Sequence, residues 1–241
     1  TNKTVITENL KDNLANVDAV DQIFTNNLLT NAANAALGIP AEELQISMLQ
    51  ADLTITNIVS KDDIDKLRTD TSGNITIQNL QDTKENISAL TGFSDVILTS
   101  ANITVTNNVD KAEADLIDEI NTSGTVTLTS ITDASEKITQ VQNNSNIILD
   151  TSKIIITNAI SLQVANSING FTTGQVTLQK VEDTVSNITS IDGLTTSEVS
   201  MAAAAITVTD AVNLINANAI NGFTDGQVTL QKVEDNYENI Q

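Results

Sequence analysis

The sequence contains a close internal repeat in its C-terminal part. Residues 165–188 and 217–240 are identical at 19 of 24 positions when the two segments are aligned at an offset of 52 residues. A segment of this size cannot enclose a core by itself, so each copy must bury its apolar face against a similar neighbour. The repeat therefore constrains the fold more than any other feature of the chain.

Weaker copies of two alternating strand patterns extend the repeat toward the N-terminus. The first-type strands are LTITN (53–57), ITVTN (103–107), IIITN (154–158) and ITVTD (206–210). The second-type strands are NITIQ (74–78), TVTLT (125–129), QVTLQ (175–179) and QVTLQ (227–231). Their period of two predicts strands with one apolar face. The alternation of the two types predicts a super-repeat of about 51 residues in two unequal halves.

A glycine precedes each second-type strand at a matching place. These glycines are Gly73, Gly124, Gly174 and Gly226. We expect one reused turn at these places, in which glycine supplies a positive φ that other residues resist.

A segment with helical spacing of apolar residues follows each strand. After second-type strands the spacing is shown by Val181, Val185 and Ile188. After a first-type strand it is shown by Val109, Ala112, Leu116, Ile117 and Ile120. The longer half also has an extra apolar step, which is consistent with a short strand or with one helical turn. This step is formed by Ile46/Met48, Val96/Leu98, Ile147/Leu149 and Val199/Met201.

This order of elements predicts an α/β fold. We expect a right-handed β-α solenoid, with a stacked parallel sheet on one side and short helices on the other. Ile103, Val105, Val176 and Leu178 are expected on the core face, with Thr104, Thr106 and Thr177 on the opposite face. Residues 46–241 are expected to form the regular repeats. Residues 1–45 are expected to form a degenerate repeat with a helical insertion at 18–45, in which a helix ends near Gly38 and a short one opens at Pro40.

Charge and composition exclude several classes of function. The chain has 31 acidic and 11 basic residues, and the formal charge of −20 argues against nucleic-acid binding and against anionic membrane surfaces. No apolar stretch approaches a membrane span, so we expect no membrane insertion. The charge favours solubility and the attraction of divalent cations.

The repeat sequence resembles a family of surface proteins. AITVTDAVNLINANAINGFTDGQVTL (205–230) is similar to the tandem Thr/Asn/Asp-rich β-α repeats of giant secreted bacterial proteins of the surface-layer, adhesin or surface-fibre type. The resemblance covers roughly residues 46–241 and is strongest over 154–241. It implies an extracellular location at the cell surface and has no active-site pattern to transfer.

We do not expect an enzyme. The chain has no His and no Cys, which removes the commonest general base and the usual nitrogen and sulfur metal ligands, and no phosphate-binding glycine loop is present. The carboxylate pairs Asp62/Asp63 and Glu182/Asp183 are expected to be solvated on helices. No cofactor is expected, although calcium is possible. The candidate oxygen ligands are Asp210, Asp225, Glu234 and Asp235, for which caps and turns are the competing explanation.

The sequence thus favours a structural repeat segment of a surface layer, sheath or filament. The expected partners are other copies or neighbouring repeats of the same protein. One alternative is an adhesin stalk or module that binds glycans or another surface. A remoter alternative is an ice-binding face built from Thr54/Thr56, Thr104/Thr106 and Thr207/Thr209, although Ile155 interrupts this row.

Overall fold

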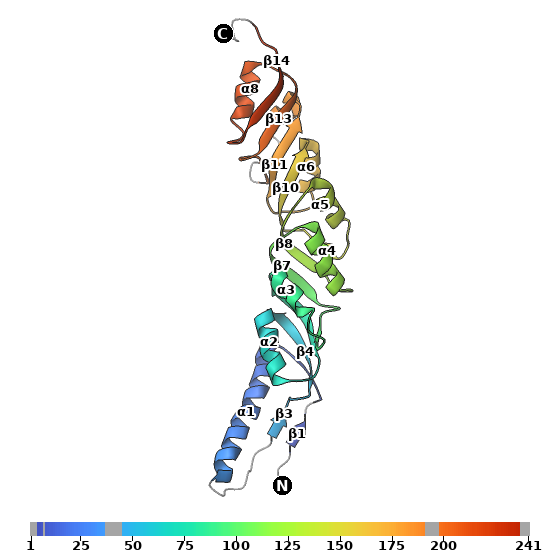
Figure 1. Cartoon of the computed structure of the whole chain (residues 1–241), viewed down its shortest axis with the longest axis vertical. Coiled ribbons are helices and arrows are strands. Elements are labelled where there is room, and N and C mark those ends of the chain that lie inside the picture. The colour runs from blue at the N-terminus through green and yellow to red at the C-terminus, as the bar shows by residue number, and fades with distance from the viewer. Residues whose placement is uncertain (1–3, 7, 37–44, 191–197, 237–241) are drawn as a thin grey trace. The chain divides into compact units, whose positions relative to one another are not determined.

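The computed structural model is an α/β protein with a large, open, parallel sheet (Figure 1). It describes residues 4–6, 8–36, 45–190 and 198–236. The chain divides into two compact units, one formed by residues 1–105 and 117–126 and the other by residues 106–116 and 127–241. The repeat-like α/β parallel-sheet arrangement predicted from the sequence is confirmed.

The main sheet has 12 strands. Its path runs β14-β13-β11-β10-β8-β7-β5-β4-β2, and the short strands β6, β9 and β12 pair with β5, β8 and β11. A separate parallel pair joins β1 (Thr4–Ile6) to β3 (Gln45–Ser47). The strands of the main sheet are β2 (Asn9–Asp12), β4 (Asp52–Val59), β5 (Ile75–Asp82), β6 (Val96–Ile97), β7 (Asn102–Val109), β8 (Val126–Asp133), β9 (Ile147–Ile148), β10 (Lys153–Ile160), β11 (Val176–Asp183), β12 (Val199–Ser200), β13 (Ala205–Val212) and β14 (Val228–Val233).

A helix follows almost every long strand after a single extended residue. The helices of the described residues are α1 (Leu14–Ala36), α2 (Lys61–Asp70), α3 (Lys84–Leu90), α4 (Lys111–Ile120), α5 (Ser135–Gln142), α6 (Leu162–Asn169), α7 (Val185–Thr189) and α8 (Leu214–Asn221). The residue between strand and helix is commonly a side-chain cap. Ser60, for example, forms a reciprocal capping box with Asp63.

The core is made of apolar residues that alternate along the strands. Ile103, Val105, Val176 and Leu178 are at most 1% exposed, as the period of two predicted. Like residues stack across the parallel ladder, for example Ile55 on Ile77. Thin layers of Ile, Val and Leu therefore supply the core, since β-branched side chains pack well on a pleated surface.

Several residues assigned to helices from the sequence belong to strands instead. Val181 lies in β11 and Val109 lies in β7, and both are buried. Register shifts occur midway along several strand pairs, for instance between Ile156 and Ala159. Such an irregularity lengthens the spacing of buried residues from two to three or four, which imitates a helix. In α4 the buried residues are Ala114 and Ile117, whereas Leu116 is 59% exposed.

The extra apolar step of the longer half is a short parallel strand. β6, β9 and β12 each pair with the preceding long strand, as Val96 does with Ile75. The helix predicted within 18–45 is present as α1, which begins earlier, at Leu14. The expected features at Gly38 and Pro40 lie outside the described residues.

The glycine before each second-type strand is required by close backbone approach, so the prediction of a positive φ was wrong. None of the four glycines has a φ in the left-handed region. A Cβ on Gly174 would lie 2.3 Å from the carbonyl oxygen of Ser152 in the preceding half-repeat. The Thr172 hydroxyl donates to that same oxygen at 2.8 Å and accepts from the Gly174 amide. Corresponding clashes would occur at Gly73, Gly124 and Gly226 with the carbonyl oxygens of Ala51, Ala101 and Ala204.

Candidate functional site

The most distinctive polar arrangement joins the end of a strand to the start of an earlier helix. Asp183, at the end of β11, is only 7% exposed. One carboxylate oxygen accepts from the Leu162 amide at the first position of α6 (2.9 Å), and the other accepts from the Thr184 amide (2.8 Å) and the Asn187 side chain (2.7 Å). The first amides of a helix have no partner within the helix, so Asp183 satisfies a group that would otherwise be buried unpaired.

This contact recurs along the chain. In at least seven places within the described residues, a side chain accepts from the first amide of a helix one half-repeat earlier. The donor and acceptor residues are Leu14 and Asn57, Lys61 and Asp82, Lys111 and Asp133, Ser135 and Asn158, Leu162 and Asp183, Val185 and Asp210, and Leu214 and Asp235. The donor–acceptor distances lie between 2.7 and 3.0 Å. We call these the helix-start contacts.

The helix-start contacts were missed from the sequence, although a signal was present. An Asp stands at a matching place at the end of, or two residues after, these second-type strands: Asp82, Asp133, Asp183 and Asp235. The helix dipole and the unpaired amides both favour a carboxylate at this position. Alignment of the copies over their full length would have revealed the pattern.

The electrostatics at Asp82 reflect the same arrangement. Partial burial by itself would raise the pKa of Asp82, but hydrogen bonds from the Lys61 amide, the Asn86 side chain and the Thr83 amide outweigh it. The Lys61 charge acts in the same direction, so the pKa lies below its ordinary value. Asp82 is therefore held ionised by the contact it makes.

Asp70, at the end of α2, shows the opposite behaviour. Burial raises its pKa, a hydrogen bond from Thr69 opposes the rise, and the charges of Asp21 and Asp18 on α1 add to it. Like charges from two helices thus meet at this place.

The structure places the four candidate calcium ligands in different roles. Asp210 and Asp235 form helix-start contacts with the Val185 and Leu214 amides. Glu234 forms an ion pair with Lys232, and Asp225 is exposed in the turn before β14. Among the described residues, no group of three or more His, Cys, Asp or Glu side chains is arranged to hold a metal ion. Calcium binding stays a prediction.

The two carboxylate pairs considered for acid–base chemistry also have structural surroundings. Asp63 accepts from the amide and hydroxyl of Ser60 in the α2 capping box. Glu182 and Asp183 lie in β11, so their expected place on a helix was wrong, and Asp183 is buried. Asp62 and Glu182 are exposed, as solvated surface acids would be.

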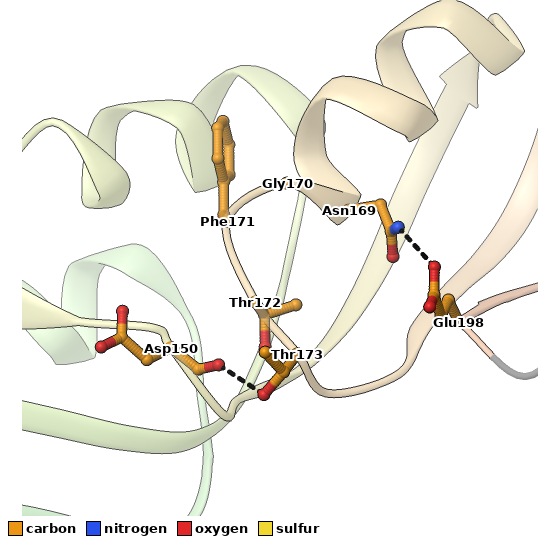
Figure 2. Close-up of a pocket in the computed structure, with 7 residues that line it drawn as sticks. All are labelled: Asp150, Asn169, Gly170, Phe171, Thr172, Thr173 and Glu198. Carbon is orange, nitrogen blue, oxygen red and sulfur yellow. Dashed lines mark hydrogen bonds between the residues drawn. The ribbon is translucent and has the colours of Figure 1, made fainter.

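A shallow hollow of about 540 Å³ lies beside Thr172 and Thr173, in the segment that precedes β11 (Figure 2). The Asn169 side chain donates to Glu198 at 3.3 Å, and the Thr173 hydroxyl donates to the backbone carbonyl of Asp150 at 2.9 Å. The Oδ1 atom of Asn169 is buried without a hydrogen-bond partner. Phe171 supplies the aromatic ring of the lining. The hollow thus combines an aromatic ring with carboxylate, amide and hydroxyl groups.

The threonine rows are present but interrupted. Thr54 pairs with Thr76, and Thr207 pairs with Thr229. Charged residues occupy flanking positions, since Lys11 pairs with Thr54 and Glu182 pairs with Thr207. An ice-binding face remains a prediction.

Comparisons with known proteins do not assign the chain to a family. The chain matches no protein-family model, no curated protein and no solved structure. Within the described part of the chain, no helix has both the length and the apolar character that crossing a bilayer requires.

Proposed function

We propose that the chain is a non-enzymatic structural repeat segment of an extracellular microbial surface assembly, such as a surface layer, sheath or filament. In this proposal the half-repeats continue as a right-handed β-α solenoid. The observation that carries it is the recurrence of the helix-start contacts, in which partly or fully buried carboxylates join one half-repeat to the next.

Repetition of one contact favours a structural role over a catalytic one. An enzyme places unlike groups around a single reacting centre, whereas Asp82, Asp133, Asp183 and Asp235 each meet the same kind of backbone amide. Each further half-repeat adds length and the same stabilising contacts. This pattern suits an extended material whose units are interchangeable.

The surface charge suggests how such a material is regulated. A formal charge of −20 makes copies repel one another at low ionic strength. Calcium ions that bridge exposed carboxylates would offset this repulsion. We therefore propose self-association, or association with similar repeats, that calcium promotes.

Negative-stain electron microscopy of the purified chain tests this proposal. Images are recorded in chelator, in millimolar calcium and in magnesium at the same concentration. Fibres or sheets are expected in calcium, and magnesium serves as the control for general charge screening. Isolated particles under all three conditions would contradict self-assembly by this segment.

The hollow beside Asp150 favours an adhesin-type module as a second candidate function. Aromatic rings with nearby amide and carboxylate groups suit the apolar and polar faces of a sugar. The corresponding positions of the next copy differ, because Ala202 replaces Asp150 and Asp225 replaces Thr173. A glycan-array screen tests this candidate with Phe171→Ala and, as a matched control, Phe223→Ala. Binding that only Phe171→Ala abolishes would support it, and an absence of binding by the unaltered chain would reject it.

A further inference from the structure

Two strands of the main sheet share one sequence but differ in their neighbours. Residues 176–181 of β11 and residues 228–233 of β14 both read VTLQKV. Each pairs in parallel with the first-type strand before it, β10 or β13, in the same register. The burial of the two copies can therefore be compared residue by residue.

The far edge of β11 is covered by the next half-repeat. Val176 pairs with Val199 of β12, and the Val176 amide donates to the carbonyl oxygen of Glu198 at 2.7 Å. Further along, Val181 pairs with Ile206 and Asp183 pairs with Val208 of β13. This cover leaves Val181 only 1% exposed.

The far edge of β14 carries no strand among the described residues. Val233, the counterpart of Val181, is 44% exposed. Val228 and Leu230 are partly exposed, whereas Val176 and Leu178 are buried. On the adjacent helix α8, Leu214 and Ala217 are partly exposed, whereas their counterparts Leu162 and Ala165 on α6 are buried. An apolar strand edge of this kind is a template for pairing.

We propose that β14, with the exposed face of α8, is a docking surface for a polypeptide half-repeat of the first type. The partner has the chemistry of residues 198–212: a two-residue Val-Ser strand opposite Val228 and Thr229, followed by an Ala-Ile-Thr-Val strand opposite residues 232–235. This inference rests on the proposed structural function and names the partner of that assembly. Its support is continuity with the β11–β13 interface, in which the same sequence is already covered in this way.

The alternation of strand types decides against simple end-to-end stacking of β14 on β2 of a second copy. Along the main path, second-type strands border only first-type strands. β2 pairs with β4 as β11 pairs with β13, so β2 is itself of the second type. Joining β14 to β2 would place two second-type edges together, without the first-type strand that fits between them.

Hydrogen exchange on an extended chain tests the proposal. A second copy of residues 190–221 is appended after Gln241, which continues the offset of 52 residues. Exchange at the amides of residues 228–235 is measured by mass spectrometry. Residues 176–183 serve as an internal reference, because their sequence is the same and their edge is already covered. We expect the extension to lower the exchange rate of residues 232–235 about tenfold or more, so that it approaches the rate of the reference residues.

The control extension carries Ile206→Asp and Val208→Asp in the appended copy, where charge would disfavour burial. Equal exchange with both extensions would overturn the proposal. Slow exchange at residues 232–235 in an unextended chain that light scattering shows to be dimeric would also overturn it, in favour of a second copy as the occupant. The readout does not require fibres, so it is independent of the electron microscopy that tests the proposed function.

Discussion

The backbone amide of Leu162 donates a 2.9 Å hydrogen bond to the carboxylate of Asp183, which lies 21 residues later in the chain. This bond joins the start of α6 to the end of β11, and equivalent bonds join other helices to later strands. A single side chain therefore caps a helix and fixes the register of two half-repeats.

Loss of this carboxylate should destabilise the protein. Asp183→Ala leaves the buried Leu162 amide without its acceptor, and we expect the free energy of unfolding to fall by about 1–3 kcal/mol. Glu182→Ala is the matched control, because its exposed side chain should change stability by less than about 0.5 kcal/mol. Urea unfolding followed by circular dichroism measures both. Equal effects of the two substitutions would show that Asp183 has no special role.

A methyl group at Gly174 should be poorly tolerated. Gly174→Ala places a Cβ 2.3 Å from the Ser152 carbonyl oxygen, so the two half-repeats must separate. We expect the free energy of unfolding to fall by about 2–3 kcal/mol or more, which is at the upper end of the effects of overpacking a core. Gly170→Ala is the control, since its Cβ would lie 3.3 Å from Ser167. Thermal unfolding compares the two, and similar melting temperatures would contradict the clash.

Acid should weaken the contact made by Asp82. Its pKa is depressed in the folded state, so its contribution is present above about pH 4 and is lost as the pH falls through the folded value. Asp82→Asn should lower stability at pH 7 and flatten the dependence of stability on pH below pH 4. The measurement is urea unfolding between pH 2 and pH 7. If the free energy of unfolding of the variant fell below pH 4 as steeply as that of the unaltered chain, Asp82 would be ruled out as a source of this dependence.

Removal of the partly buried negative charge of Asp70 should stabilise the protein. The pKa of Asp70 is raised by burial and by Asp21 and Asp18, so its ionised form costs stability at neutral pH. That cost disappears as the pH falls through the raised pKa. Asp70→Asn should therefore raise the melting temperature at pH 7 and make little difference at pH 3. A lower melting temperature of the variant at pH 7 would contradict a destabilising effect of the ionised Asp70.

The positions of the register shifts along the strands could not be derived from periodicity. Beside a register shift, successive buried residues of a strand lie three positions apart, as Leu178 and Val181 do in β11. Periodicity alone assigns this spacing to a helix. The choice between these two conformations depends on the neighbouring strand that receives the backbone hydrogen bonds. That neighbour lies one half-repeat away in sequence.

The sequence by itself determined the parallel α/β repeat, its two strand types and the buried residues Ile103, Val105, Val176 and Leu178, because these follow from local periodicity and from self-similarity. Only the tertiary structure decided what the recurring Asp and Gly residues do. Asp183 reaches a helix start 21 residues earlier, and Gly174 leaves room for the carbonyl oxygen of Ser152. Both are contacts between successive half-repeats, and their geometry exists only once the half-repeats have packed together.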